Sequence, residues 1–150
     1  AIIAATATKK IGALIDRVGN VIVLRGGIIL ILLSVVLFST VSSYSMYTIL
    51  ISYLFMSLGF SSLVASNSNE LSLTLASEHV GAGMGMNQLV SFFGGAFGVG
   101  VTSMLMVLQK GMEAASIFHN IYAGLCILPL VSFYLLRKYV ESKKIRIMAS

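Results

Sequence analysis

The side chains that could carry acid–base, nucleophilic or metal chemistry are few in this 150-residue sequence, and the acids avoid the middle of its apolar segments. The five acids are Asp16, Glu70, Glu78, Glu113 and Glu141. An apolar segment long enough to cross a bilayer separates His79 from His119, so they cannot bind one metal ion, and Cys126 has no second ligand at metal-binding spacing. The sequence also lacks a glycine-rich phosphate loop ending in Lys and Ser or Thr. We therefore expect neither an enzyme nor a bound cofactor or metal ion.

The segments that would position these groups are strongly apolar. Hydrophobic residues make up 57% of the sequence and charged residues 10%, whereas a soluble domain carries about 25% charged residues. Such a chain cannot cover a surface that faces water, so we expect an integral membrane protein in contact with the lipid bilayer. Residues 1–8 are already apolar, and no signal-peptide pattern is present. We interpret this start as the inside of a helix in a longer polytopic protein.

The apolar segments divide into spans by length. We expect the end of one transmembrane helix at residues 1–8, four complete spans at about 21–42, 46–66, 81–108 and 116–136, and a tail at 137–150. A span needs roughly 20 apolar residues. Pro129 should kink the last span, because a proline inside a helix removes a backbone hydrogen bond and clashes with the preceding turn. The predicted fold is an all-α membrane protein in which no acid lies at the middle of a span.

The basic residues are divided very unequally between the two sides of this topology. One side carries nine of the ten, namely Lys9, Lys10, Arg17, Arg25, Arg137, Lys138, Lys143, Lys144 and Arg146. The other side carries Lys110 alone. Cytoplasmic loops are enriched in Lys and Arg, so we predict a multi-pass protein of the cell membrane with a cytoplasmic C-terminus. This bias also accounts for the net charge of +5, and no aromatic–basic pattern points to nucleic acid.

Residues 81–100 are unusually rich in glycine, which would weaken a soluble helix. In lipid the backbone stays helical, because it finds no water to bond with. Small residues recur four apart in the pairs Gly81 and Gly85, Gly94 and Gly98, and Ala96 and Gly100. That spacing places them on common helix faces where a neighbouring backbone can approach closely. We predict a packing helix that can also slide.

Polar and aromatic residues on two spans are candidates for a substrate cavity. On the second span Tyr53, Met56, Ser57 and Phe60 share one face at helical spacing, and the third span carries Asn87, Gln88 and Ser91. Amides and hydroxyls beside aromatic rings and flexible methionine suit a broad, amphiphilic ligand. The alternative is that these polar groups only form hydrogen bonds between helices.

The loop before the first complete span combines glycines with charges: Gly12, Asp16, Arg17 and Gly19, with Arg25 further on. A tight turn between two spans favours glycine. Asp16 is placed to meet an arginine or the positive N-terminus of a neighbouring helix, which would form a conformational latch. The alternative is a solvated loop that only fixes orientation.

Two segments of the sequence resemble a transporter family. Residues 12–19 resemble the G-x-L-x-D-R-x-G loop of the major facilitator superfamily, in the copy that lies in the second half of those proteins. Residues 75–84, followed by Asn87, Ser91 and Phe92, are similar to the corresponding region of the fourteen-span tetracycline and multidrug proton antiporters. The resemblance covers essentially the whole chain.

The resemblance implies the C-terminal part of a two-bundle transporter that works by alternating access. The second span would line the central cavity, the glycine-rich third span would lie between the bundles, and the first and fourth would lie outside. The family loop usually carries a basic residue after its second glycine, whereas Asn20 and Val21 follow here, and Arg25 would serve instead. The N-terminal helices of the same protein would be its partner, in a monomer.

The implied function is export of amphiphilic drugs such as tetracycline, driven by the proton gradient and without a cofactor. Because no predicted span holds an acid at mid-depth, we expect the coupling carboxylate outside this chain. Two alternatives stay open: a metabolite or sugar carrier of the same superfamily, and a small membrane scaffold or accessory protein that does not transport.

Overall fold

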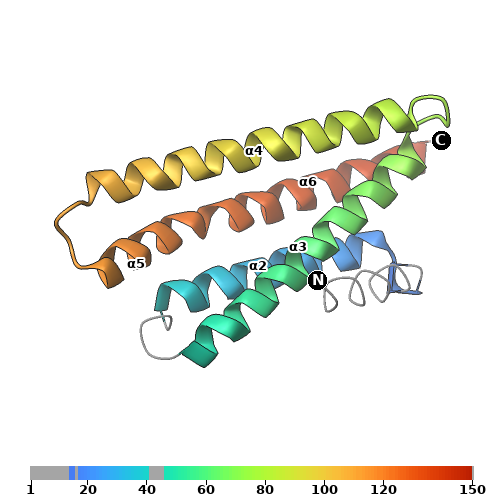
Figure 1. Ribbon diagram of the computed structural model, residues 1–150. Coiled ribbons are helices and arrows are strands. Elements are labelled where there is room, and N and C mark those ends of the chain that lie inside the picture. The colour runs from blue at the N-terminus through green and yellow to red at the C-terminus, as the bar shows by residue number, and fades with distance from the viewer. Residues whose placement is uncertain (1–13, 16, 41–45, 150) are drawn as a thin grey trace.

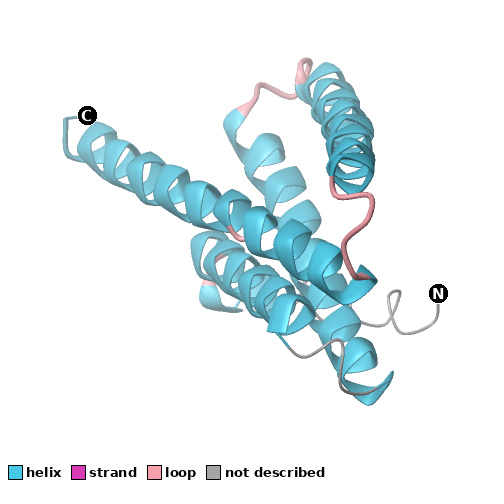
Figure 2. Cartoon of the chain, turned by 90° about the vertical axis from the view of Figure 1, so that its left-hand side faces the viewer, coloured by secondary structure: helices cyan, strands magenta, loops and turns pink. Residues whose placement is uncertain are grey.

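The computed structural model describes residues 14–15, 17–40 and 46–149, and these residues form helices and short connections without a strand (Figures 1 and 2). The helices are α2 (Asn20–Thr40), α3 (Met46–Thr74), α4 (Val80–Leu108), α5 (Ala114–Leu125) and α6 (Ile127–Ala149). Four helical stretches are long and apolar enough to cross a membrane: Asn20–Thr40, Met46–Thr74, Val80–Leu108 and Ala114–Ser142. The all-α membrane fold predicted from the sequence is therefore confirmed.

The helix ends differ from the predicted spans in three places. Helix α3, predicted as the span at 46–66, does not stop with the apolar residues but continues to Thr74. Its polar residues keep one face of this extension against the bundle. The last span is divided into α5 and α6 at Cys126. Pro129 explains this break, since it donates no backbone hydrogen bond to Leu125 and its ring excludes a regular preceding turn. The helix is thus interrupted close to the predicted kink, while the bend itself stays a prediction. Helix α6 continues through the segment predicted as a tail.

Small residues hold α2 and α3 in close contact. A Cβ atom on Gly59 would lie 2.8 Å from the carbonyl oxygen of Gly27, and a Cβ on Gly27 would lie 3.1 Å from the carbonyl oxygen of Gly59. Along the same interface the buried Ser34 donates a hydrogen bond from Oγ to the carbonyl oxygen of Ser52 at 2.7 Å. Because no large side chain lies between them at these positions, the backbones of α2 and α3 approach closely, as in other membrane helix pairs. The sequence interpretation did not select this pair of glycines.

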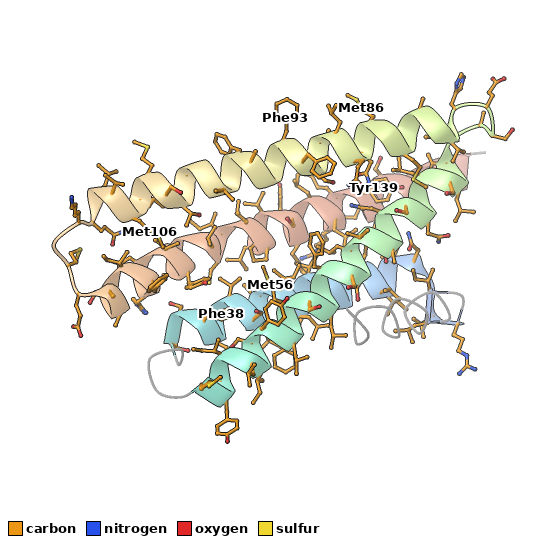
Figure 3. All side chains as sticks on the ribbon, in the orientation of Figure 1. Phe38, Met56, Met86, Phe93, Met106 and Tyr139 are labelled. Carbon is orange, nitrogen blue, oxygen red and sulfur yellow. The ribbon has the colours of Figure 1, made fainter. Side chains whose placement is uncertain are left out.

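Helix α4 lies at the edge of the assembly and contacts α3 and α5 among the described helices (Figure 1). None of its residues is buried. A Cβ would meet no described atom within 4 Å at any of the glycines predicted to pack, namely Gly81, Gly85, Gly94, Gly98 and Gly100. Met86 and Phe93 point away from the other helices (Figure 3). The predicted close packing of these glycines therefore concerns partners beyond the described residues, and it stays a prediction.

The two ends of the bundle are fastened differently. At one end α5 contacts α2, where Nδ1 of His119 lies 2.7 Å from the carbonyl oxygen of Ser39. The rings of Phe38 and Tyr122 also stack there, with their centroids 5.1 Å apart. A carbonyl oxygen only accepts, so Nδ1 of His119 carries the proton in this bond. His119 thus connects α5 to α2. The opposite end contains the start of α2, the end of α3 and the start of α4.

Candidate functional site

At that opposite end, the carboxylate of Glu70 on α3 accepts hydrogen bonds from two other helices. Nδ2 of Asn20, the first residue of α2, donates to Oε2 at 2.8 Å and also to the carbonyl oxygen of Ser66 at 3.0 Å. The hydroxyl of Tyr139 on α6 donates to Oε1 at 2.6 Å. Hydrogen bonds to an ionised group are among the strongest in proteins. One carboxylate therefore ties together α2, α3 and α6.

Glu70 lies on the wall of a cavity of about 600 Å³ between α2, α3, α4 and α6. Its polar lining residues are Asn67, Glu70, Thr74, Asn87, Ser132 and Tyr139, and the remaining lining residues are leucines and one isoleucine. The α3 members recur at helical spacing, so the extended helix presents its polar residues to the cavity as one face. A largely apolar cavity with a few convergent polar groups is typical of small-molecule sites.

Two buried oxygens beside this site have no hydrogen-bond partner within the described part of the chain. They are Oδ1 of Asn20 and Oγ of Ser66. The side-chain nitrogen of Asn20 donates both of its hydrogen bonds, to Glu70 and to the Ser66 carbonyl oxygen. Exchanging the amide nitrogen and oxygen would place an acceptor against these two acceptors, so the orientation of the amide is fixed. Buried polar atoms are normally paired, so these two oxygens are exceptions among the described residues.

The chemistry available here is proton and cation binding by one carboxylate. Both oxygens of Glu70 accept a hydrogen bond in the structure. If Glu70 takes up a proton, the Tyr139 hydroxyl can turn from donor to acceptor, because it can play either part. Within the described residues no three His, Cys, Asp or Glu side chains lie close enough to hold a metal ion.

The predicted latch is described only in part. Gly12 and Asp16 lie outside the described residues. Gly19 has a φ of +89°, a conformation that side chains other than glycine rarely adopt, and its N–H bonds to the carbonyl oxygen of Ile15 at 2.9 Å. Arg17 is exposed. Arg25 is exposed as well and faces a second, smaller cavity beside α6.

The structure separates the residues that were predicted to line a substrate cavity. Asn87 lines the cavity that contains Glu70. Of the four on α3, Tyr53, Met56 and Phe60 are exposed, and Ser57 is half-buried.

The other two candidates, Gln88 and Ser91, are exposed on α4, and the Ser91 hydroxyl bonds to its own helix at the carbonyl oxygen of Asn87. Within the described chain, then, Asn87 is the member of the predicted set that meets the cavity. For the remaining members, a role in lining a substrate cavity stays a prediction that would need helices beyond the described residues.

Sequence reasoning missed the three residues that make the network: Asn20, Glu70 and Tyr139. The available signal was the spacing of Leu63, Asn67 and Glu70, which continues one helix face beyond the predicted end of the span. No local signal joins the bonded residues, because they are separated by 50 and 69 positions in the sequence.

Comparison with known proteins gives one match. The family model described as Major Facilitator Superfamily matches residues 1–149. No curated protein and no solved structure matches the chain.

Proposed function

The chain belongs to the major facilitator superfamily, and from that premise we propose that it forms part of a secondary transporter that exports amphiphilic drugs such as tetracycline in exchange for protons. Membership makes it a transporter chain of a multi-pass membrane protein rather than an enzyme. The proposal adds the substrate class, the coupling ion and an orientation with the C-terminus in the cytoplasm. The proton gradient would be the driving force, with no cofactor.

The observation that carries the proposal is the carboxylate of Glu70 at the wall of a mixed polar and apolar cavity. Glu70 lies four residues before the end of α3 and not at the middle of a span, so the proposal replaces the expectation that the coupling carboxylate lies outside this chain. Ionisable residues in membrane helices commonly serve proton relays. Taking up a proton at Glu70 changes the bonds that it accepts from Asn20 and Tyr139. Proton binding would thereby alter the connection between α2, α3 and α6, which is what coupling to a conformational change requires.

The exposed surface of α4 supports the alternating-access part of the proposal. Phe92, Phe93 and Phe97 are each at least 70% exposed on this helix, and a Cβ on any of its glycines except Gly83 would meet no described atom within 4 Å. We propose that further helices of the same protein, in a monomer, lie against this surface and slide along it. Small residues permit two packing arrangements at similar backbone distance, because no side chain has to leave a pocket.

The test uses everted membrane vesicles that contain the product of the complete gene and an acid interior generated by respiration. Adding tetracycline should release protons, measured as recovery of the fluorescence of a pH-sensitive dye. Glu70→Gln should abolish this recovery, whereas Glu78→Gln should leave it intact, because Glu78 is exposed and pairs only with the neighbouring His79 at 3.5 Å among the described residues.

Other results of this assay would favour a metabolite carrier, a mechanism without Glu70, or a scaffold that does not transport. Proton release caused by a sugar or metabolite and not by tetracycline would replace the drug assignment with a metabolite carrier. Full coupling in Glu70→Gln would remove Glu70 from the mechanism. No response to any solute, with the protein present in the membrane, would contradict transport and favour a scaffold.

A further inference from the structure

Two arginines from different helices face one cavity that is separate from the Glu70 site. Arg25 on α2 and Arg137 on α6 line a cavity of about 310 Å³ together with Phe133. Helices α2 and α6 are in contact, so the two guanidinium groups are held at the same level of the bundle. Neither arginine takes part in the Glu70 network.

The positive charge of this cavity is poorly neutralised by the protein. Arg137 pairs with Glu141, but Nε lies 3.8 Å from Oε1 and both side chains are about two-thirds exposed or more. Such exposed pairs are worth little. Arg25 has no ion pair with any described acid. Two guanidinium groups with one weak carboxylate partner fit an anion with several oxygens, since each guanidinium binds phosphate through two parallel bonds.

Apolar stripes lead away from both arginines along the helices. On α2, Ile29 and Leu33 follow Arg25 at intervals of four and are 48% and 47% exposed. On α6, Phe133 and Leu130 precede Arg137 at intervals of four and three and are 39% and 55% exposed. Residues at these intervals share a helix face. An anion bound between the arginines would therefore have exposed apolar surface directly beside it, toward the middle of both spans.

We propose that Arg25 and Arg137 bind the phosphate of an anionic phospholipid, with its acyl chains along the two apolar stripes. A free phosphate would use the arginines and leave the stripes uncovered, whereas a phospholipid satisfies both. Basic pockets between transmembrane helices are known to bind anionic headgroups. The site lies at the end of the bundle that holds the described basic residues Arg17, Arg25, Arg137 and Lys138, so the lipid belongs to the leaflet on that side.

The test is native mass spectrometry of the purified product of the complete gene in detergent, titrated with phosphatidylglycerol and, separately, with phosphatidylcholine. We expect phosphatidylglycerol to be retained more tightly than phosphatidylcholine. Arg25→Gln and Arg137→Gln should each weaken retention by roughly tenfold or more, because each removes a pair of charge-assisted hydrogen bonds. Lys138→Gln is the matched control, because it removes one charge beside Arg137 from a side chain that lies over the ring of Tyr134, 5.6 Å from its centre.

Three results would overturn the proposal. An equal loss in Lys138→Gln would indicate a diffuse positive surface instead of a site. Displacement by inorganic phosphate at concentrations as low as those of phosphatidylglycerol would remove the role of the acyl chains. If a glutamine variant fails to fold, Arg25→Lys and Arg137→Lys keep the charge and lose the paired bonds. Wild-type retention in both lysine variants would then exclude phosphate binding by guanidinium groups.

Discussion

The contact between Gly27 and Gly59 offers the sharpest test of the packing, through Gly59→Ala. The added Cβ would lie 2.7 Å from Cγ1 of Ile31, 2.8 Å from the carbonyl oxygen of Gly27 and 3.0 Å from the backbone nitrogen of Ile31. Two of these three atoms belong to the backbone of α2, so a side-chain rotation cannot relieve the clash. The helices must separate by several tenths of an ångström, and overpacking of this kind costs about 1–3 kcal/mol.

The assay is reversible unfolding of the chain in mixed detergent micelles with increasing dodecyl sulfate, followed by helical circular dichroism. Gly59→Ala should lower the free energy of unfolding by the amount given above. Gly98→Ala is the matched control, because its Cβ would meet no described atom within 4 Å. We expect its stability to be unchanged or slightly raised, since alanine favours the helix. Equal stability of Gly59→Ala and wild type would refute the close α2–α3 contact.

Three further predictions follow from other parts of the chain. Ser34→Ala removes a buried hydrogen bond to a backbone carbonyl of α3 at 2.7 Å, and it should cost about 1 kcal/mol in the same unfolding assay, where no change would contradict its contribution. Asp16→Asn in the product of the complete gene should reduce drug efflux with normal membrane insertion, and unchanged efflux would exclude the latch. In a Cys126→Ser background, a membrane-impermeant maleimide should label Ser43→Cys from outside intact cells and Ser142→Cys only after lysis, and the reverse pattern would overturn the orientation.

The long helices could be predicted from the sequence, because lipid leaves the backbone few alternatives to a helix. Span-length apolar runs therefore identified α2, α3 and α4, and the kink expected at Pro129 lies close to the place where the last span is divided. The end of α3 was predicted too early, at residue 66 instead of Thr74, because the prediction followed hydropathy. Hydropathy marks where apolar side chains stop, whereas the helix continues as long as its polar residues find partners, as Glu70 does.

The site could be predicted much less well, because its members meet only through the tertiary fold. In the sequence, Asn20 stands where the family loop usually has a basic residue, and Tyr139 lies in the predicted tail. Both side chains nevertheless donate hydrogen bonds to the Glu70 carboxylate. Glycine spacing was similarly ambiguous. It marks faces where a backbone can approach, but Gly27 and Gly59 have a described partner and Gly98 has none.

The most direct test of the whole account is drug accumulation in intact cells that express the complete gene, with wild type compared with Gly98→Leu, before and after a protonophore is added. The account predicts low tetracycline accumulation in wild type, a rise to the level of cells without the gene once the protonophore is present, and high accumulation throughout in Gly98→Leu, because the bulky side chain blocks the surface of α4. Low accumulation that persists with the protonophore, or wild-type efflux by Gly98→Leu, would contradict proton-driven export by a helix that slides on its glycines.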